Sequence, residues 1–280
     1  MDSDRLKVAF AFVTLCLLWG LSYPIAKIGV RDSTPLVFAT VSGLLALFVH
    51  AALGWWGGGR HPTGSGFHRV AFVMGIFNVA ALSGLLNIGV ARVSAGESSI
   101  LIYTQPIWVG LLAWLLLGER PTLLKTAGLI AGFGGMVLVL SDRIRPGQDS
   151  PAWAYAALLG ASLSWTVGTI YFKRIQGGFD FLWLNFYQSI YGVAIMGAFA
   201  VILENPGRTD WLSPAFWIAA FFFGALASGA GRLLWFYLLK RGQASVVSSY
   251  VFLSPLVAVL SGAVILGEAL HPLLIAGGAL

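Results

Sequence analysis

Charged side chains are scarce in this sequence. Asp, Glu, Lys and Arg make up 10% of its 280 residues, where about 25% is usual for a soluble domain, and hydrophobic types make up 58%. The 17 basic and 11 acidic residues are too few to cover the hydrated surface that one or two soluble domains of this length would expose. The composition therefore argues against a water-soluble protein.

Cysteine is nearly absent, and the sequence lacks the common catalytic motifs. Cys16 is the single cysteine, which excludes an intramolecular disulfide, and the 4 histidines are scattered without metal-ligand spacing. No Walker sequence, HExxH, GxSxG or DxDxDG loop occurs. We therefore expect no enzyme, no metal and no cofactor. The basic residues that give the net charge of +6 lie mainly between the apolar stretches, where membrane topology accounts for them. We therefore also expect no nucleic-acid partner.

Long stretches without any charge are what the sequence has instead. A helix that crosses a hydrocarbon core of ~30 Å needs about 20 apolar residues, and most of these stretches are long enough for one crossing. They cover residues 8–26, 33–59, 70–91, 98–118, 126–141, 150–172, 181–203, 211–231 and 242–267. The pattern predicts an all-α, multi-pass membrane protein with the lipid bilayer as its surroundings.

The basic residues between the stretches predict an orientation. The first stretch has no small-residue cleavage site, so it is interpreted as a retained span and not as a signal peptide. With the N-terminus in the cytoplasm, ten basic residues fall on the cytoplasmic side and six on the opposite side. The positive-inside rule therefore favours a cytoplasmic N-terminus.

Two motif pairs repeat along the chain at nearly the same interval. A tryptophan stands eight residues before a lysine in both halves, at an offset of 146 positions: Trp19 and Lys27, then Trp165 and Lys173. A proline stands thirteen residues before a Leu-Gly-Glu glutamate in both halves, at an offset of 149 positions: Pro106 and Glu119, then Pro255 and Glu268. The repeats predict that residues 1–145 and 146–280 are two copies of one unit.

An odd number of spans in each copy predicts an inverted repeat. Five spans force the second copy to insert upside down relative to the first, as in many secondary transporters. The expected architecture is ten transmembrane helices in two inverted five-helix repeats around a central cavity. The tenth stretch, residues 272–280, is short, so we expect an incomplete last helix in a chain trimmed at its C-terminus.

These motifs, taken in order, resemble the EamA type of the drug/metabolite transporter superfamily. The matching elements are Leu18-Trp19-Gly20 with Pro24 and Lys27, Ser94-Ala95 with Pro106 and Leu117-Gly118-Glu119-Arg120, and Gln243-Ala244-Ser245 with Pro255 and Leu266-Gly267-Glu268. Thr166 departs from the pattern, because glycine more often follows this tryptophan in the family's second half. The 11 Trp, 8 Tyr and 19 Phe also resemble aromatic amino acid exporters of the YddG type. The resemblance implies a secondary transporter of the bacterial inner membrane.

Proline and lysine residues are the candidates for helix breaks and gates. Pro106 and Pro255 lie inside spans, where proline removes a hydrogen bond, and Pro24 lies in the first span. Lys27 and Lys173 occupy equivalent places in the two halves. One interpretation is that they steer or gate substrate at the two mouths of the transporter; the other is that their positive charge complements the dipole at a helix C-terminus. We expect Glu119 and Glu268 to lie beside the N-terminus of the helix that follows each of them.

Polar and aromatic residues within the spans are the candidates for substrate binding. Glu97 and Arg232 are charges in apolar surroundings, which marks them as functional candidates, although an interfacial position or a structural ion pair is the alternative. The paired tryptophans line a cavity or anchor the membrane interface, and the hydroxyl clusters bind substrate or pack helices. The predicted set is Trp19, Tyr23, Asn78, Glu97, Ser98, Tyr103, Trp165, Arg232, Ser248, Ser249 and Tyr250.

The function expected from these features is export of small amphipathic metabolites by alternating access. Amino acids, including aromatic ones, are the favoured substrates. The alternatives are proton-coupled export of drugs or other metabolites, for which Glu97 is the candidate proton carrier, and a membrane-embedded enzyme. The expected partners are a small-molecule substrate and lipid, and the chain is expected to act as a monomer.

Overall fold

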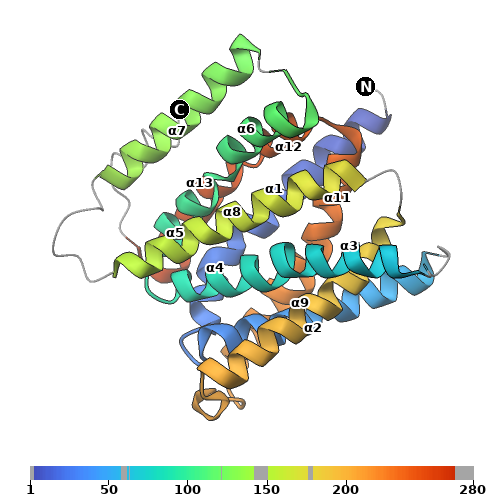
Figure 1. The fold of residues 1–280 in the computed structure, drawn as a ribbon. Helices are drawn as coiled ribbons and strands as arrows, with labels where there is room; N and C mark the ends of the chain where they lie inside the picture. The colour runs from blue at the N-terminus through green and yellow to red at the C-terminus, as the bar shows by residue number, and fades with distance from the viewer. Residues whose placement is uncertain are drawn as a thin grey trace.

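The structure is a computed structural model that describes residues 3–57, 62, 64–120, 122–141, 151–175 and 179–268. Within these ranges the chain is helical and contains no strand (Figure 1). The helices are α1 (Ser3–Gly29), α2 (Pro35–Trp56), α3 (Ser65–Gly75), α4 (Leu82–Val90), α5 (Ala95–Ile102), α6 (Gln105–Leu117), α7 (Leu123–Ser141), α8 (Ala152–Ile175), α9 (Phe181–Leu203), α10 (Pro214–Phe221), α11 (Gly231–Arg241), α12 (Ala244–Tyr250) and α13 (Leu253–Leu266). Between them lie two π-helical segments, η1 (Ile76–Ala81) and η3 (Phe222–Ala230), and a short 3-10 turn, η2 (Pro206–Arg208).

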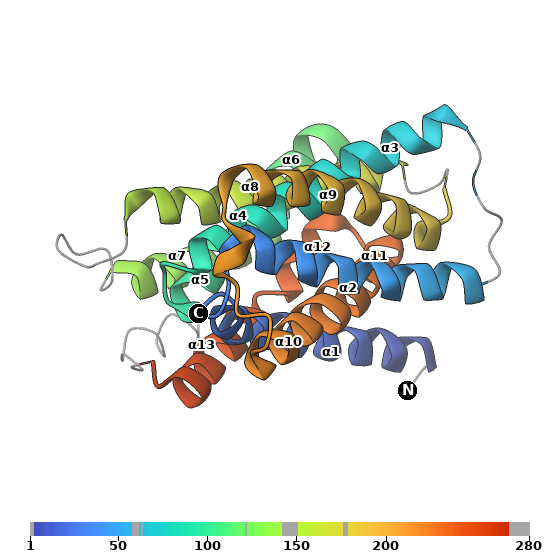
Figure 2. The ribbon, with the colours of Figure 1, turned by 90° about the horizontal axis from the view of Figure 1, so that it is seen from below.

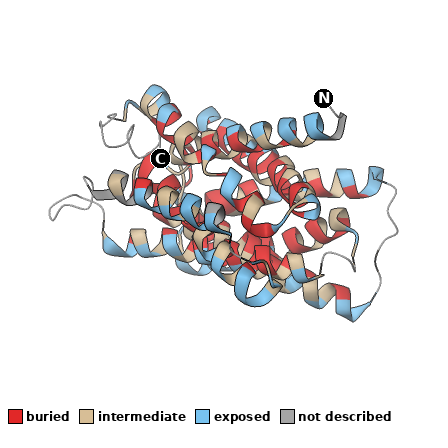
Figure 3. Ribbon diagram, turned by 90° about the horizontal axis from the view of Figure 1, so that it is seen from above, coloured by how far each residue is buried: buried red, intermediate tan, exposed pale blue. Residues whose placement is uncertain are grey.

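The predicted membrane class is confirmed. Seven helical passes in the described ranges are long and apolar enough to cross a membrane, and α7 and α8 add helices of 19 and 24 residues at two further predicted stretches. Large apolar side chains such as Phe10, Phe48 and Val201 are exposed on the outer faces, as lipid contact requires. Figure 3 shows the buried residues gathered between the helices. The tenth stretch, residues 272–280, lies outside the described residues.

The helix boundaries follow from local sequence. Pro35 begins α2, where its missing N–H costs nothing, and the Asp180 carboxylate accepts hydrogen bonds from the first N–H groups of α9. Gly118 and Gly267 end α6 and α13 in the left-handed conformation, with φ of +69° at both. This conformation turns the chain back on itself, and glycine adopts it without a Cβ penalty.

Two passes are broken at matching places. α5 ends at Ile102 and α6 begins at Gln105, while α12 ends at Tyr250 and α13 begins at Leu253. A proline cannot donate a hydrogen bond and collides with the carbonyl four residues earlier. For Pro106 and Pro255 these carbonyls belong to residues 102 and 251, at the two interruptions, which accounts for both breaks. Pro24, by contrast, lies inside α1, which continues to Gly29, so it does not break that helix.

The broken passes cross each other in opposite directions. α5 packs against α13 and α6 packs against α12, so the start of each pass lies beside the end of the other. The first helix of each half packs on the broken pass of the other half, α1 on α13 and α8 on α6. The two halves of the chain therefore interlock along their length.

A π-helical segment interrupts the third pass of each half. η1 joins α3 to α4, and η3 joins α10 to α11. π-Helical turns are rare and occur frequently at functional sites. The carbonyl of Phe77 in η1 accepts a hydrogen bond from the Ser164 hydroxyl at 2.8 Å, and the carbonyl of Ala227 in η3 accepts one from Nε1 of Trp19 at 3.0 Å. Each donor lies on the first helix of the other half, α8 or α1.

Candidate functional site

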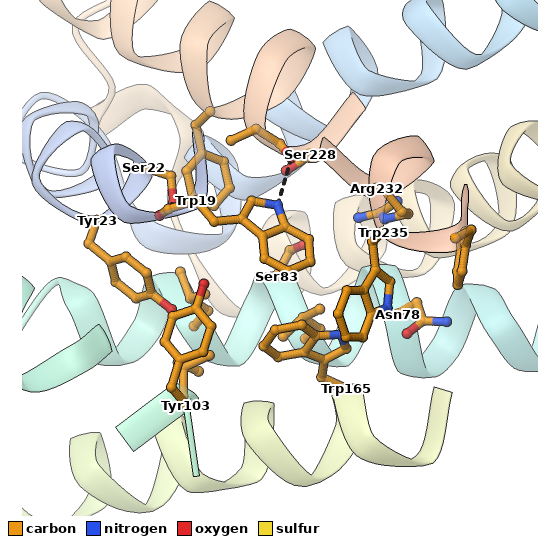
Figure 4. A pocket seen from close by; sticks show the side chains of 16 residues that line it. Trp19, Ser22, Tyr23, Asn78, Ser83, Tyr103, Trp165, Ser228, Arg232 and Trp235 are labelled. Carbon is orange, nitrogen blue, oxygen red and sulfur yellow. Dashed lines mark hydrogen bonds between the residues drawn. The ribbon is translucent and has the colours of Figure 1, made fainter. Parts of the chain in front are cut away.

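A cavity lies at the centre of the bundle, between helices from both halves of the chain (Figure 4). Its volume is about 80 Å³, which is room for several water molecules. Its wall is formed by residues of α1, η1, α4, α5, α8, η3 and α11. The lining residues are Trp19, Ser22, Tyr23, Asn78, Leu82, Ser83, Leu86, Ile102, Tyr103, Trp165, Phe223, Ala227, Ser228, Arg232, Trp235 and Phe236.

Three tryptophan rings form one side of the cavity. The ring centroids of Trp19 and Trp165 lie 5.0 Å apart at an interplanar angle of 86°, and Trp235 lies 5.5 Å from Trp19 and 5.3 Å from Trp165. The hydrogen bond from Trp19 to the carbonyl of Ala227 fixes the orientation of its indole. Edge-to-face pairs of this kind add stability beyond the area that they bury. The cavity therefore has a preformed aromatic wall.

Two tyrosines extend this wall. Tyr23 and Tyr103 are almost fully buried, and their ring centroids lie 6.2 Å apart. Tyr103 also contacts Trp165 at 5.7 Å and 78°. Tyr103 directly follows α5 at the break in the fourth pass, so the interruption between α5 and α6 places an aromatic ring at the cavity.

Among the described residues that line the cavity, Arg232 is the charged one. It lies in the first turn of α11, directly after η3, and is 8% exposed. In the described part of the chain no carboxylate lies within ion-pair distance of its guanidinium, and no Asp or Glu lines the cavity. A buried cation without a counter-charge is costly in an apolar environment. The cavity is therefore positively charged and suited to an anionic group.

Asn78 and three serines supply the remaining polar groups of the lining. Asn78 lies in η1, where its amide nitrogen is 3.6 Å from the sulfur of Met74. It packs directly on Gly168 of α8, where any Cβ would collide with the amide group. Ser22, Ser83 and Ser228 also line the cavity. Neutral hydrogen-bonding groups thus accompany the single positive charge.

The structure brings together about half of the residues predicted to bind substrate. Trp19, Tyr23, Asn78, Tyr103, Trp165 and Arg232 all line the cavity, although they come from distant parts of the sequence. Trp235 was missed, together with Ser22, Ser83 and Ser228. Trp235 stands three residues after Arg232, on the same face of a helix, and that spacing was the signal available in the sequence.

The other predicted residues lie elsewhere. Ser98 and Ser248 are buried within α5 and α12, Ser249 donates to the carbonyl of Ser245, and Tyr250 is 60% exposed, on the side of the bundle that carries the N-terminal half of α1. None of these four residues lines the cavity. The short helices α5 and α12 turn their hydroxyl groups toward helix packing, which was the alternative interpretation of these clusters.

Glu97 belongs to a helix cap and not to the cavity lining. Its carboxylate accepts hydrogen bonds from the backbone N–H and the hydroxyl of Ser94, at 3.3 and 2.8 Å, and the Ser94 hydroxyl accepts one from the N–H of Glu97 at 3.2 Å. This reciprocal pair is a capping box at the N-terminus of α5. The charge in this apolar stretch thus has a structural role.

Glu268 caps the same helix from the other half of the chain. Its carboxylate accepts from the N–H groups of Ala95 and Gly96 at 2.9 and 3.3 Å. Nζ of Lys27 lies 3.8 Å from this carboxylate and donates to the carbonyl of Val93 at 2.8 Å. We call this group of residues, Lys27, Val93, Ala95, Gly96 and Glu268, the Glu268 cap.

Glu119 makes the matching arrangement at the start of α12. Its carboxylate accepts from the N–H groups of Ala244 and Ser245 at 2.8 and 3.1 Å and from the Ser245 hydroxyl at 2.6 Å. Nζ of Lys173 donates to the carbonyls of Leu239 and Gly242, both at 2.8 Å. We call this group, Glu119, Lys173, Leu239, Gly242, Ala244 and Ser245, the Glu119 cap.

The two caps correct the expected place of these glutamates. We expected each glutamate beside the N-terminus of the helix that follows it, but the carboxylates bond to the N-terminus of the broken pass in the other half. The helix expected after Glu268 lies outside the described residues. The left-handed glycine before each glutamate turns the chain back toward its antiparallel neighbour, which explains the difference. Lys27 and Lys173 are part of these caps and do not line the cavity.

Comparison with known families identifies the chain. The profile of the EamA-like transporter family matches it twice, at residues 6–141 and 152–280. This chain belongs to the EamA-like transporter family. The resemblance inferred from the Trp, Pro and Leu-Gly-Glu motifs is confirmed at the level of the family.

Proteins described as transporters align with nearly the whole chain. It is 30% identical to the uncharacterized transporter YvbV of Bacillus subtilis over 98% of this chain and 88% of that protein. It is 25% identical to the uncharacterized inner membrane transporter YedA of Escherichia coli over 93% of this chain and 83% of that protein. A solved crystal structure with 19% sequence identity superimposes with a TM-score of 0.75 over 98% of this chain and 95% of the other, which shows the same fold.

Membership in the family determines the general activity. The protein is a multi-pass membrane transporter of the EamA-like family and not an enzyme. Its surroundings are lipid, its substrate is a small molecule, and relatives such as YedA are described as inner membrane proteins. The central cavity is the candidate site in this EamA-like transporter, because side chains from both halves meet there.

Proposed function

We propose that this EamA-like transporter exports small amphipathic carboxylates, most of all amino acids with aromatic or apolar side chains, from the bacterial cytoplasm. The observation that carries the proposal is Arg232, a buried cation without a carboxylate partner in the described residues, facing a wall of three tryptophans. A guanidinium binds a carboxylate through two parallel hydrogen bonds. The substrate would thus supply the missing counter-charge.

The aromatic wall suits the other two parts of such a substrate. Indole and phenol faces attract an ammonium group by cation–π contact, worth about 0.5–2 kcal/mol in a desolvated site. The rings of Trp19, Trp165 and Tyr103 would also stack against an aromatic or aliphatic side chain. Asn78 and the cavity serines would bind the remaining polar atoms. A wall built mainly from rings favours a broad range of apolar side chains.

A rearrangement has to precede binding. Ligand sites commonly enclose about 300–1,000 Å³, and this cavity offers about 80 Å³. We propose alternating access between two inverted five-helix repeats, residues 1–145 and 146–280, in a protein with ten spans and a cytoplasmic N-terminus. The double match of the family profile supports the duplication, and the antiparallel broken passes support the inversion.

The two caps support a specific form of this motion. The Glu268 cap closes the start of α5 and the Glu119 cap closes the start of α12, and these ends lie at opposite ends of the crossed passes. Opening toward one side would release one cap while the other stays formed. Lys27 and Lys173 would then act as gating residues through the caps and not through contact with substrate.

Proton-coupled drug export receives less support. That alternative needs Glu97 as a proton carrier at the cavity, and the Glu97 carboxylate is occupied in the capping box of α5. The positively charged lining also disfavours cationic drugs. The observations therefore favour a substrate that carries a carboxylate.

Counterflow of radiolabelled substrate in proteoliposomes tests the proposal. We expect transient accumulation of phenylalanine with the wild type and its loss in Arg232→Gln, with Arg31→Gln as a charge-matched control at an exposed position. Trp165→Ala should reduce phenylalanine transport more than threonine transport, whereas Trp108→Ala, on the outer face of α6, should affect neither. Normal counterflow of phenylalanine by a well-folded Arg232→Gln variant would reject the carboxylate-binding role. Absence of counterflow for every amino acid by the wild type would reject the substrate class.

A further inference from the structure

A second hollow lies on the outside of the bundle, between the N-terminal half of α1, the end of α11 and the break between α12 and α13. We call it the α1–α12 groove. Its volume is about 710 Å³, and it is lined by Arg5, Val8, Ala9, Phe12, Val13, Cys16, Arg241, Tyr250 and Leu253. None of these residues lines the central cavity. Figure 2 shows the N-terminal end of α1 at the edge of the bundle.

The walls of the groove are mostly apolar and exposed on the outside of the bundle. Val13 is 52% exposed, Tyr250 60% and Leu253 47%, although all three are large side chains. Phe12 and Tyr250 meet at 4.9 Å and 66°. Cys16, whose sulfur lies 3.9 Å from the carbonyl of Tyr250, is the buried residue of the lining on α1 farthest from Arg5. An acyl chain would find continuous apolar contact along this surface.

The charged side chains that line the groove are positive. Arg5 and Arg241 are its charged residues, and no Asp or Glu is among the described residues that line it. The guanidinium of Arg241 lies 3.8 Å from the centroid of the Tyr237 ring, which holds it in place. Arg5 lies near the N-terminus of α1, where the helix dipole also favours an anion. A phosphate group therefore complements this part of the groove.

The length of the groove fits one leaflet of a bilayer. Arg5 and Cys16 are eleven residues apart on a single helix, a rise of about 16 Å at 1.5 Å per residue. Half of a hydrocarbon core of ~30 Å is about 15 Å. When the arginines lie at the level of the headgroups, the end of the groove at Cys16 reaches the middle of the membrane. The groove thus has the dimensions of one lipid and not of a crossing helix.

We propose that the α1–α12 groove binds one anionic phospholipid, with its phosphate at Arg5 and Arg241 and an acyl chain along Val8, Phe12 and Val13. The site is separate from the transport cavity and does not depend on the identity of the transported substrate. It would link the N-terminal half of α1 to the break between α12 and α13, which belong to different halves of the chain.

Native mass spectrometry of the delipidated 280-residue chain tests the site. Titration with phosphatidylglycerol should yield one tightly retained lipid. Phosphatidylcholine with the same acyl chains should bind at least about tenfold more weakly. In Arg5→Gln/Arg241→Gln the preference should vanish. The control Arg31→Gln/Arg174→Gln removes the same charge from exposed positions outside the groove and should keep it. The single variants Arg5→Gln and Arg241→Gln should each show a partial loss, which keeps the test valid if the double variant fails to fold.

A second pair of variants tests the apolar wall. Val13→Trp fills the groove and should weaken phosphatidylglycerol retention, whereas Leu17→Trp, also exposed on α1 but outside the groove, should not. Glycerol phosphate, which has the headgroup charge without an acyl chain, should show no adduct. Equal retention of the two phospholipids by the wild type would overturn the proposal. A dimer that Val13→Trp dissociates, without a lipid adduct, would overturn it in favour of a second copy of the chain.

Discussion

The carboxylate of Glu119 caps the helix that begins next to Ser245, accepting hydrogen bonds from both the backbone N–H and the hydroxyl of that serine, at 3.1 and 2.6 Å. The two residues belong to different halves of the chain. The first N–H groups of a helix have no partner within the helix, and here a carboxylate from a neighbouring element satisfies them.

Removing the charge from either cap should destabilise the protein. We expect Glu119→Gln and Glu268→Gln to cost about 1–2 kcal/mol each, because a capping carboxylate and its interaction with a helix N-terminus are lost. Thermal unfolding in detergent, followed by tryptophan fluorescence, provides the measurement. Asp180→Asn weakens a cap within a single helix, so it should lower the unfolding temperature without changing transport. Glutamine variants as stable as the wild type would contradict the role of the caps.

Gly168 should not tolerate a side chain. Gly168→Ala places a methyl group against the amide of Asn78, which has to leave its position in the cavity lining. We expect lower stability, by about 1–3 kcal/mol, and reduced transport, since overpacking forces such shifts. Gly66→Ala is the control, because nothing lies within 4 Å of the added Cβ. A fully stable and active Gly168→Ala variant would show that Asn78 can move freely.

His50 should contribute to stability by joining three helical elements. Its Nδ1 lies 2.9 Å from the Ser189 hydroxyl of α9, and its Nε2 lies 3.0 Å from the carbonyl of Gly229 in η3. The carbonyl can only accept, so Nε2 carries the proton and Nδ1 accepts from the serine. His50→Leu leaves two buried groups unsatisfied, at about 1–3 kcal/mol for each.

The matched comparison for His50 is His68→Leu, which removes one hydrogen bond, to Tyr191, away from the π-helical segments. Urea unfolding followed by circular dichroism should give a lower free energy of unfolding for His50→Leu than for His68→Leu. The reverse order would mean that the bridge at η3 is of little importance.

The topology can be tested with single cysteines in a Cys16→Ser background. Ser33→Cys and Asn205→Cys should react with a membrane-impermeant maleimide on intact cells, and Gly64→Cys only after permeabilisation. The hydrogen bond between the hydroxyls of Ser33 and Thr209, at 3.0 Å, places the first two positions at one end of the bundle. Labelling at Gly64→Cys alone on intact cells would reverse the proposed orientation.

The membrane class and the helix positions could be predicted from the sequence because uncharged apolar stretches of about 20 residues are typical of membrane spans. Proline chemistry likewise located the two broken passes. η1 and η3 were not predictable, since one extra residue in a helical turn leaves no signature in an apolar segment. The helix that Glu119 caps, α12, was not predicted either, because contacts between the halves depend on tertiary structure. Glu97 was predicted to bind substrate because of its charge, and the capping-box spacing from Ser94 to Glu97 was a signal for its structural role that the sequence analysis did not use.

The reciprocal caps have a consequence for biosynthesis. When the ribosome has completed α5, the carboxylate that satisfies its N–H groups at Ala95 and Gly96 is still more than 160 residues from being synthesised. The nascent first half therefore enters the bilayer before the carboxylate that caps this helix start is available. We expect the first half to stay with the insertion machinery until Glu268 has been synthesised, so that docking of the two halves is a late event in assembly.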